Sequence, residues 1–399
     1  MSRMRVESIS LRGWLSFGWE PVSLELSPVT MLLGPNGSGK SNVLLALDLL
    51  RSLAGGDFRQ VPQGHGGAFE FLHKGPGGDG LMVLTTTLSG GRWPPLRHVL
   101  TLRLQEAQLV LEEERLETRD NHQGDQPFQL AVANGGMLLL RVPSENSERG
   151  RQDPVFGRIQ RNVVPWPSAQ SILSSLGAMA PWLADVAAAL ADIAVYHHLP
   201  LGPFEPARLF QQADQTDRRL LPSGQNLALV LNRLLRDDRA GERLRREVRA
   251  VYAQLKSVGF EVRAGHIQLY AEEEGGYPLG APRLSSGTLR WLCLLALLLD
   301  PEPPSLLCIE EPELGLHPDL LHRLAELVKE ASGRCSIVLT THSPDLVSEF
   351  SDQPESVVIC ERPFGTTELQ RLERGPLASW LKDYSLGHAW QSGRLGGRR

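Results

Sequence analysis

The spacing of apolar residues predicts a mixed α/β chain. Alternating apolar and polar positions, or short apolar runs between turn residues, are typical of strands, whereas apolar residues three and four apart are typical of amphipathic helices. The first pattern predicts strands at residues 6–11, 22–26, 29–33, 81–88, 98–104, 108–111, 128–133, 137–142, 260–263, 266–271, 306–309 and 336–339. The second pattern predicts helices at residues 43–50, 182–195, 226–235, 242–256 and 288–299.

The strands between residues 81 and 142 follow one another closely, which predicts an antiparallel β-meander that forms a side sheet. An Asn-Gly-Gly sequence at residues 134–136 favours a hairpin turn that closes the last pair. The polar segment 144–160 is typical of a loop or a boundary. Residues 55–80 are dense in glycine and therefore also predict a loop.

A glycine-rich segment links a predicted strand to a predicted helix. Residues 34–41 read Gly-Pro-Asn-Gly-Ser-Gly-Lys-Ser, which fits the pattern G-x-x-x-x-G-K-[S/T] at every fixed position. The apolar run 29–33 precedes it and the helical pattern 43–50 follows it, as a phosphate-binding loop requires. Backbone N–H groups would surround a β-phosphate, Lys40 would reach the β- and γ-oxygens, and Ser41 would ligate Mg²⁺. The predicted nucleotide-binding residues of this loop are Asn36, Gly37, Ser38, Gly39, Lys40 and Ser41.

Two acids and a histidine follow predicted core strands in the last quarter of the chain. The apolar strand 306–309 ends in Glu310 and Glu311, and the strand 336–339 leads into Thr-Thr-His-Ser-Pro, which contains His342. Two acids at a strand exit can divide the work of phosphoryl transfer, because one holds Mg²⁺ while the other polarises the attacking water. We assign Glu310 to the metal and Glu311 to the water. His342 would donate a hydrogen bond to the γ-phosphate or position the water.

A Leu-Ser-Ser-Gly sequence opens the apolar helix predicted at residues 288–299. Ser285, Ser286 and Gly287 would place unpaired backbone N–H groups at the positive end of this helix, where an anion binds favourably. Ser-Gly helix starts are common, so the segment alone is weak evidence for a phosphate site. Its place shortly before the paired acids strengthens the prediction.

Three groups of residues have two open interpretations. Trp14 or Phe17 could stack on adenine, although aromatic residues in a strand connection more often serve packing. Gln60 or Gln63 could sense the γ-phosphate or be solvated surface residues. The segment 233–249 carries seven arginines against four acids, which predicts either a salt-bridged helix face or a contact with a nucleic-acid backbone.

Composition sets the broad class. The chain has 399 residues, 41% of them hydrophobic, which allows two domains or one domain with a large insertion. A net charge of −5 provides no global positive field, so a nucleic-acid contact would need a local patch. The four cysteines lie singly in apolar runs, which favours buried thiols in a reducing compartment over disulfides or zinc. The first residues lack an apolar signal core and no apolar run is long enough for a bilayer, so we expect a cytoplasmic protein that does not enter a membrane.

Taken in order, the motifs GPNGSGKS, LSSG, CIEEPELGLHP and TTHSP resemble those of ATP-binding-cassette ATPases of the RecF, SMC and OLD type, which are AAA-type ATPases with a split head. Ser-Leu-Gly-His-Ala-Trp at 385–390 and Gly-Gln-Asn-Leu at 224–227 also resemble short ATPases of this group from bacterial defence systems. The resemblance implies an ABC-type P-loop NTPase head with an antiparallel β side sheet and a mainly helical central insertion. Residues 1–80 and 260–399 would form the head, and residues 81–259 the insertion.

In such a head, residues 34–41 are the Walker A motif, Glu310 and Glu311 the Walker B motif with its catalytic acid, residues 285–287 the signature, and His342 the switch histidine. The resemblance implies ATP and Mg²⁺ as cofactors. It also implies a head-to-tail homodimer in which the signature of one subunit caps the ATP of the other. Glu310 stands where many cassettes have Asp. OLD proteins carry a Toprim nuclease after the head, whereas little of this chain follows the switch histidine and no D-x-D pair occurs. We therefore expect any nuclease to be a separate effector.

These features predict an ATP-hydrolysing dimerisation switch. It would act with DNA or with a separate effector, such as a Toprim-like nuclease, in anti-phage defence or DNA repair. One alternative is the nucleotide-binding subunit of a membrane transporter, although such heads usually have short insertions. Another alternative is a sensor that binds ATP without hydrolysing it. The insertion 81–259 would recognise the partner, because it carries no assigned chemistry.

Overall fold

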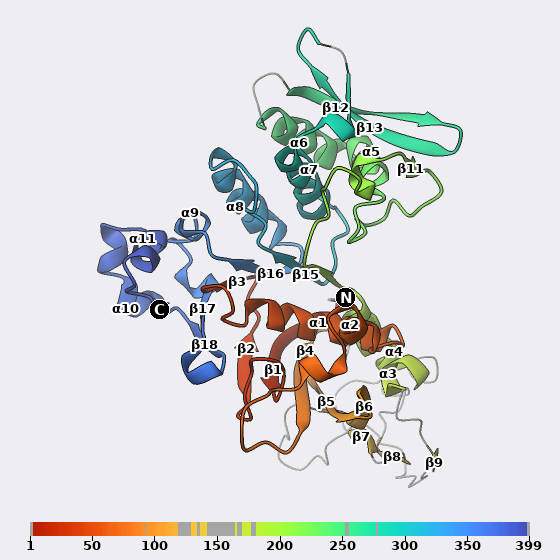
Figure 1. Ribbon diagram of the computed structural model, residues 1–399, viewed down its shortest axis with the longest axis vertical. Coiled ribbons are helices and arrows are strands. Elements are labelled where there is room, and N and C mark those ends of the chain that lie inside the picture. The colour runs from red at the N-terminus through yellow and green to blue at the C-terminus, as the bar shows by residue number, and fades with distance from the viewer. Residues whose placement is uncertain are drawn as a thin grey trace, which may run out of the picture. The chain divides into compact units, whose positions relative to one another are not determined.

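The computed structural model describes residues 3–91, 93–118, 129–133, 136–141, 164–165, 170–176, 181–251, 255–276 and 278–396. The chain forms two compact units, each assembled from separate stretches of sequence (Figure 1). Unit 1 contains residues 1–27, 34–194 and 359–370, and unit 2 contains residues 28–33, 195–358 and 371–399.

Unit 1 is built on an eight-stranded sheet with the order β2-β1-β4-β5-β6-β7-β8-β9. Each strand from β4 to β8 pairs antiparallel with the next, so the predicted meander is confirmed. Residues 134–135 of the predicted hairpin turn and the segment 144–160 lie outside the described residues. The strands are β1 (Arg5–Arg12), β2 (Val22–Glu25), β4 (Leu81–Ser89), β5 (Leu96–Gln105), β6 (Gln108–Thr118), β7 (Gln129–Ala133), β8 (Gly136–Arg141) and β9 (Val164–Pro165).

Strand β6 extends seven residues beyond its predicted end at residue 111. The prediction stopped too early because a buried glutamate interrupts the apolar pattern of the strand. Glu114 is fully buried. Its carboxylate lies 2.9 Å from Nε2 of His98 and accepts hydrogen bonds from Ser171 Oγ at 2.8 Å and from the Ile172 amide at 2.7 Å. A buried carboxylate is unfavourable unless such partners satisfy it. The contacts join β5, β6 and the start of a helix, and no local pattern predicts them.

The first helix of unit 1, α1, begins at the predicted phosphate loop. It buries an apolar face that contacts α3 and α4. The predicted loop at residues 55–80 contains the short helices α2 and η1. The helix predicted at 182–195 ends at residue 191, and residues 193–196 form a strand, because a short apolar run does not distinguish the two states. The helical segments are α1 (Lys40–Ala54), α2 (Gln60–Gly64), η1 (Ala68–Phe71), α3 (Ile172–Leu176) and α4 (Pro181–Ala191).

Unit 2 holds the parallel centre of a six-stranded sheet with the order β10-β15-β16-β3-β17-β18. Strand β16 pairs parallel with β15 on one side and with β3 on the other. The registers Glu310↔Thr340 and Leu33↔Thr341 place the carboxyl ends of these three strands at one edge. The strands are β3 (Val29–Leu33), β10 (Ile193–Tyr196), β15 (Leu306–Glu310), β16 (Ser336–Thr341), β17 (Val357–Glu361) and β18 (Glu368–Arg371), and β10, β17 and β18 each contain residues of both units.

The rest of unit 2 is a small antiparallel sheet and a group of helices. Helices α5, α6 and α7 pack together beside β12 and β13 (Figure 1). The helix predicted at 242–256 runs instead from Asp238 to Arg249, and β12 begins at Leu255. In the part of the chain that is described, no helix combines the length and apolar character needed to cross a bilayer. The elements are β11 (Gln211–Gln212), β12 (Leu255–Arg263), β13 (His266–Glu273), β14 (Leu279–Gly280), α5 (Leu227–Arg236), α6 (Asp238–Arg249), α7 (Ser286–Leu298), α8 (Asp319–Ala331), α9 (Pro344–Ser348), α10 (Arg374–Leu377) and α11 (Leu386–Gln391).

Candidate nucleotide site

The predicted phosphate loop leaves the end of β3 and leads directly into α1. Gly37 and Gly39 have φ angles of 78° and 104°, which glycine adopts readily and other residues do not. A Cβ atom at Gly39 would lie only 2.2 Å from Thr367 Oγ1. Ser38 is buried, and its Oγ makes no hydrogen bond within the described residues. A buried hydroxyl in this position fits a phosphate oxygen as its partner.

Lys40 is held by the loop itself. Its buried side chain places Nζ 2.7 Å from the carbonyl oxygen of Gly34 and 2.9 Å from that of Pro35. Both acceptors are neutral, whereas a phosphate would give a stronger, charge-assisted hydrogen bond. A phosphate could therefore replace these two contacts with stronger ones. Asn36 is exposed, and Ser41 is partly exposed in the first turn of α1.

Residues far away in the sequence support this loop. Thr367 Oγ1 lies 2.6 Å from Ser16 Oγ and 2.9 Å from the carbonyl oxygen of Ser38. Asn42 Nδ2 donates to the same Ser16 hydroxyl at 2.6 Å. Local sequence does not predict any of these three supporting residues, because nothing in the pattern connects residue 367 with residue 38.

A cavity of about 700 Å³ lies beside this network in unit 1. Ser16 and Asn42 line it together with the rings of Trp19, His73 and Phe364. Trp19 and His73 meet edge to face, with 5.4 Å between ring centroids. The cavity thus joins the start of α1 to a group of aromatic side chains within the same unit.

Trp14 and Phe17 do not reach this cavity. Both side chains are fully buried, and Trp14 Nε1 donates to the carbonyl oxygen of Asn42 at 2.9 Å. Neither ring has a free face for a base, so the stacking interpretation was wrong for both and the packing interpretation is confirmed. Gln60 and Gln63 lie exposed on α2, and which of them, if either, senses phosphate stays open.

Each of the two paired acids stands beside a histidine. Glu310 Oε2 lies 3.3 Å from His197 Nδ1, and Glu311 Oε1 lies 3.2 Å from His342 Nδ1. His197 directly follows β10, and His342 directly follows β16. The sequence predicted roles for Glu311 and His342 but not their contact with each other. It gave no indication of His197, because the residues before it suit the end of a helix as well as a strand.

The backbone of Glu311 is strained. Its φ angle is 43°, in the left-handed region that non-glycine residues rarely adopt. Such a conformation costs on the order of 1–3 kcal/mol and collects at functional sites. The Glu311 N–H lies 3.1 Å from both the carbonyl and the hydroxyl oxygen of Thr340, which hold it in place. The turn directs the two neighbouring acids to different histidines.

A third acid of the motif is half-buried. Glu313 accepts a hydrogen bond from Thr341 Oγ1, and its second carboxyl oxygen makes none within the described residues. Burial raises the pKa of Glu313, although the Thr341 bond partly opposes the shift. Arg290 of α7 interacts electrostatically with both Glu313 and Glu311, while its own burial lowers the pKa of its guanidinium.

The predicted signature residues begin helix α7. Ser285 caps the helix, since its Oγ accepts a hydrogen bond from the Thr288 amide at 3.0 Å. The Ser286 hydroxyl accepts one from Arg208 Nη2 at 2.9 Å. A Cβ atom at Gly287 would come within 2.7 Å of the carbonyl oxygen of Gly315. Glycine therefore allows the helix to approach the turn that follows the paired acids.

Ion pairs occupy part of the arginine-rich segment. Arg233 pairs with Asp300 at 3.1 Å, and Arg243 and Arg246 pair with the buried Glu247 at 3.4 and 3.5 Å. These contacts favour the salt-bridged interpretation for the inner side of α5 and α6. Several arginines remain exposed, namely Arg236, Arg239, Arg245, Arg246 and Arg249.

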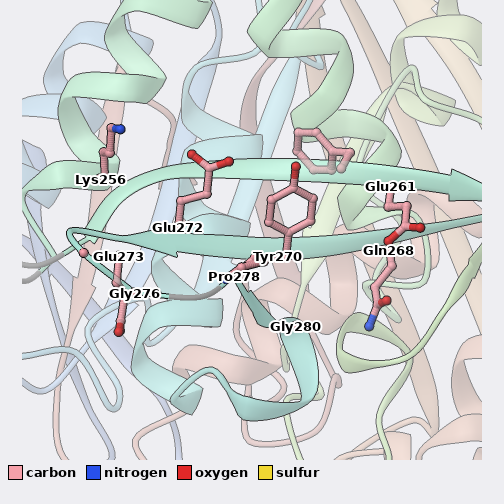
Figure 2. A pocket seen from close by; sticks show the side chains of 11 residues that line it. Lys256, Glu261, Gln268, Tyr270, Glu272, Glu273, Gly276, Pro278 and Gly280 are labelled. Atoms are coloured by element: carbon pink, nitrogen blue, oxygen red, sulfur yellow. The ribbon is translucent and has the colours of Figure 1, made fainter.

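A second cavity, of about 770 Å³, lies over β12 and β13 in unit 2 (Figure 2). Tyr270 extends across β12 because Gly259 has no side chain, and a Cβ atom there would lie 2.3 Å from the tyrosine Cζ. Three acidic side chains line the cavity as well, those of Glu261, Glu272 and Glu273. None of its lining residues belongs to the predicted nucleotide site.

Within the described residues, no group of three or more His, Cys, Asp or Glu side chains could hold a metal ion. Mg²⁺ at nucleotide sites instead uses one or two carboxylates together with phosphate oxygens and water. The Glu310 carboxylate and the Ser41 hydroxyl are oxygen donors of this kind. The four cysteines are free and buried, as predicted, and burial raises the pKa of Cys293 and Cys360 to about 12.

Fold and motifs together define an AAA-type ATPase with a P-loop head of the ABC and SMC type. Residues 29–85 and 165–348 match the family described as "AAA domain, putative AbiEii toxin, Type IV TA system". The match covers more than half of the chain, so the protein belongs to this family. No curated protein matches the chain.

Solved SMC head domains resemble the chain over nearly its whole length. The Smc head of Pyrococcus furiosus with an extended coiled coil, bound to the C-terminal domain of ScpA, has 13% identity and a TM-score of 0.51 and covers 95% of this chain and 99% of that chain. The Smc head of Pyrococcus yayanosii with a coiled coil and joint has 13% identity, a TM-score of 0.48 and coverage of 95% and 99%. The head from Thermotoga maritima has 14% identity, a TM-score of 0.43 and coverage of 92% and 99%. The first of these supports the predicted fold class.

Proposed function

We propose that the protein binds and hydrolyses ATP and that ATP closes two copies of it head to tail. The arrangement of Glu310 and Glu311 carries this proposal. The two acids leave one strand end toward different histidines, at the same sheet edge from which β3 leads into the phosphate loop. Different surroundings for neighbouring acids suit them to different roles in one reaction.

In the proposed reaction, Walker A backbone groups and Lys40 bind the phosphates, and Ser41 and Glu310 hold Mg²⁺. The ion, when bound, neutralises charge on the phosphates. Glu311 accepts a proton from the attacking water, and its strained backbone and His342 fix the direction of its carboxylate.

The signature supports closure in trans. Ser285, Ser286 and Gly287 stand at the N-terminus of α7, whose first backbone N–H groups have no acceptor within the helix. In the proposed dimer they cap the γ-phosphate held by the other copy. Hydrolysis removes that phosphate and opens the dimer.

The aromatic cavity of unit 1 supports a place for the base. Trp19 and Phe364 present rings beside the start of α1, where the phosphate loop ends. Base stacking on aromatic side chains contributes about 1–3 kcal/mol per base. We propose Trp19 as the base contact in place of the two buried rings, Trp14 and Phe17.

We further propose that the switch acts with DNA or with a separate effector, such as a Toprim-like nuclease, in anti-phage defence or DNA repair in the cytoplasm. The family description, which names a toxin and a type IV toxin–antitoxin system, supports a role beside another component. The exposed arginines of α5 and α6 support a phosphate-backbone contact. The division into a head, 1–80 and 260–399, and a partner-binding insertion, 81–259, stays a prediction.

Two measurements on the purified wild-type protein test the core of the proposal. Steady-state phosphate release with ATP and Mg²⁺ should exceed the protein-free rate. Light scattering should detect a dimer with ATP and a monomer with ADP. ATP binding without phosphate release would identify a non-hydrolysing sensor, and a mass independent of nucleotide would refute the dimerisation switch.

A further inference from the structure

A buried arginine, Arg208, forms hydrogen bonds with the residues on both sides of Ser285, the first residue of the predicted signature. Arg208 ends the short helix η3 (Pro206–Arg208), and only 6% of it is exposed. Its guanidinium hydrogen-bonds five acceptors: the carbonyl oxygens of Leu201, Ala281, Pro282 and Leu284, and the hydroxyl of Ser286. Four of these acceptors belong to residues 281–286, which lead up to helix α7 and include its first residue.

The acceptors of Arg208 are all uncharged. In the described part of the chain, no carboxylate forms an ion pair with it. Burying a charge is unfavourable unless hydrogen bonds compensate for it. The neutral carbonyls offset the cost of burying the Arg208 charge only while they all point at the guanidinium. The buried charge therefore favours the one backbone path of residues 281–286 that keeps them in place.

The hydrogen bonds of Arg208 limit which groups of the signature can bind a phosphate. The Ser286 hydroxyl accepts from Arg208 Nη2 at 2.9 Å and lies 3.4 Å from the Leu201 carbonyl oxygen, so both of its roles are taken within the subunit. Ser285 Oγ accepts a hydrogen bond from the Thr288 amide and lies 2.8 Å from Thr288 Oγ1, so its own hydrogen is left for a phosphate when the Thr288 hydroxyl is the donor of that pair. The groups left for a phosphate are therefore the Ser285 hydrogen, in that arrangement, and the first backbone N–H groups of α7, next to the serine hydroxyl that Arg208 binds.

We propose that Arg208 is a positioning residue that holds the signature turn ready for phosphate before the second copy arrives. The inference rests on the proposed function, because it assumes that the signature meets ATP in trans. A turn that is already ordered loses less conformational freedom on closure, which strengthens the dimer without any contact between Arg208 and ATP.

The test compares Arg208→Met, Arg208→Lys and the control Arg233→Met, each combined with Glu311→Gln so that ATP is not consumed. Arg233 is a suitable control because it also bonds carbonyl oxygens of unit 2, those of Asp217 and Arg218, and its ion pair is with Asp300, beyond the far end of α7, so it contacts no residue of the signature segment. Light scattering gives the dimer dissociation constant in ATP, and calorimetry gives the ATP affinity of the monomer. Hydrogen exchange of the nucleotide-free monomer reports the order of residues 282–289.

Arg208→Met should weaken ATP-dependent dimerisation by about 10- to 100-fold, the loss expected for several hydrogen bonds to a charged group. Monomer affinity for ATP should change by less than about twofold, since no Walker A contact is altered. Exchange should accelerate at 282–289 and not across the rest of unit 2. Arg208→Lys should lie between wild type and Met, because lysine keeps the charge but lacks the planar fork. The control should match the parent in dimerisation, in ATP affinity and in exchange at residues 282–289.

Unchanged dimerisation and exchange in Arg208→Met would overturn the proposal, as would faster exchange spread evenly over unit 2, which indicates a general structural role. Failure of the Glu311→Gln parent to dimerise in ATP would refute the proposed function instead. In that case hydrogen exchange decides the role of Arg208 by itself: local acceleration supports it, and no change or uniform acceleration contradicts it.

Discussion

Glu311→Gln separates the chemical step from nucleotide binding. The substitution keeps the length of the side chain, and its amide oxygen can still accept a hydrogen bond from His342 Nδ1, which lies 3.2 Å from the carboxylate in the wild type. The strained backbone and its bonds to Thr340 are also retained. What disappears is the negative charge that accepts a proton from water. Loss of a positioned general base commonly reduces the rate by about 10²- to 10⁴-fold, or roughly 3 to 5 kcal/mol of barrier.

Phosphate release under single-turnover conditions measures this loss, and calorimetry with ATP and Mg²⁺ should show an affinity near that of the wild type. With hydrolysis stalled, the variant should run as a dimer in ATP and as a monomer in ADP. Glu310→Gln is the matched control, because the same change one residue earlier should weaken Mg²⁺-dependent binding instead. If Glu311→Gln hydrolyses ATP at the wild-type rate while Glu310→Gln does not, the two acids have been assigned in reverse.

Three further predictions follow from single residues. Lys40→Ala should abolish tight ATP binding, because it removes the cation expected at the β- and γ-phosphates, and unchanged affinity in calorimetry would contradict the Walker A assignment. Since burial raises the pKa of Glu313 above its ordinary 4.5, the folded chain keeps a proton that the unfolded chain has lost, so the stability of the wild type relative to Glu313→Gln should fall as pH rises above that value. Urea unfolding of both proteins at about pH 5 and about pH 8 measures this, and a constant difference would argue against a shifted pKa. Glu114→Ala should lower the free energy of unfolding by about 3–5 kcal/mol, because it leaves the buried partners of the carboxylate unsatisfied, and a loss below about 1 kcal/mol would mean that the network is replaced by water.

Local sequence was sufficient to predict the strand–loop–helix order around the phosphate loop and the strand end that carries the paired acids. A phosphate loop needs glycines, a lysine and a strand-to-helix context within one short segment, and the paired acids follow a strand that apolar residues mark clearly. The supporting residues could not be predicted in this way. Thr367, His197 and Arg208 act on segments about 80 to more than 300 positions away in the chain, and their own neighbours carry no motif. Strand β10 shows the same limit, because its apolar residues suit a helix end equally well until the sheet order is known.

The one departure from the usual Walker B pattern has a structural explanation in unit 2. Glu310 replaces the Asp of many cassettes, and its additional methylene extends the carboxylate by about 1.5 Å. The extended carboxylate lies 3.3 Å from His197 Nδ1 at the end of β10, the strand next to β15. An aspartate on the same backbone would leave that distance too long for a hydrogen bond. The longer acid and the histidine are therefore matched to each other. Because the histidine restrains one carboxyl oxygen, a glutamate here is held almost as firmly as a shorter aspartate would be.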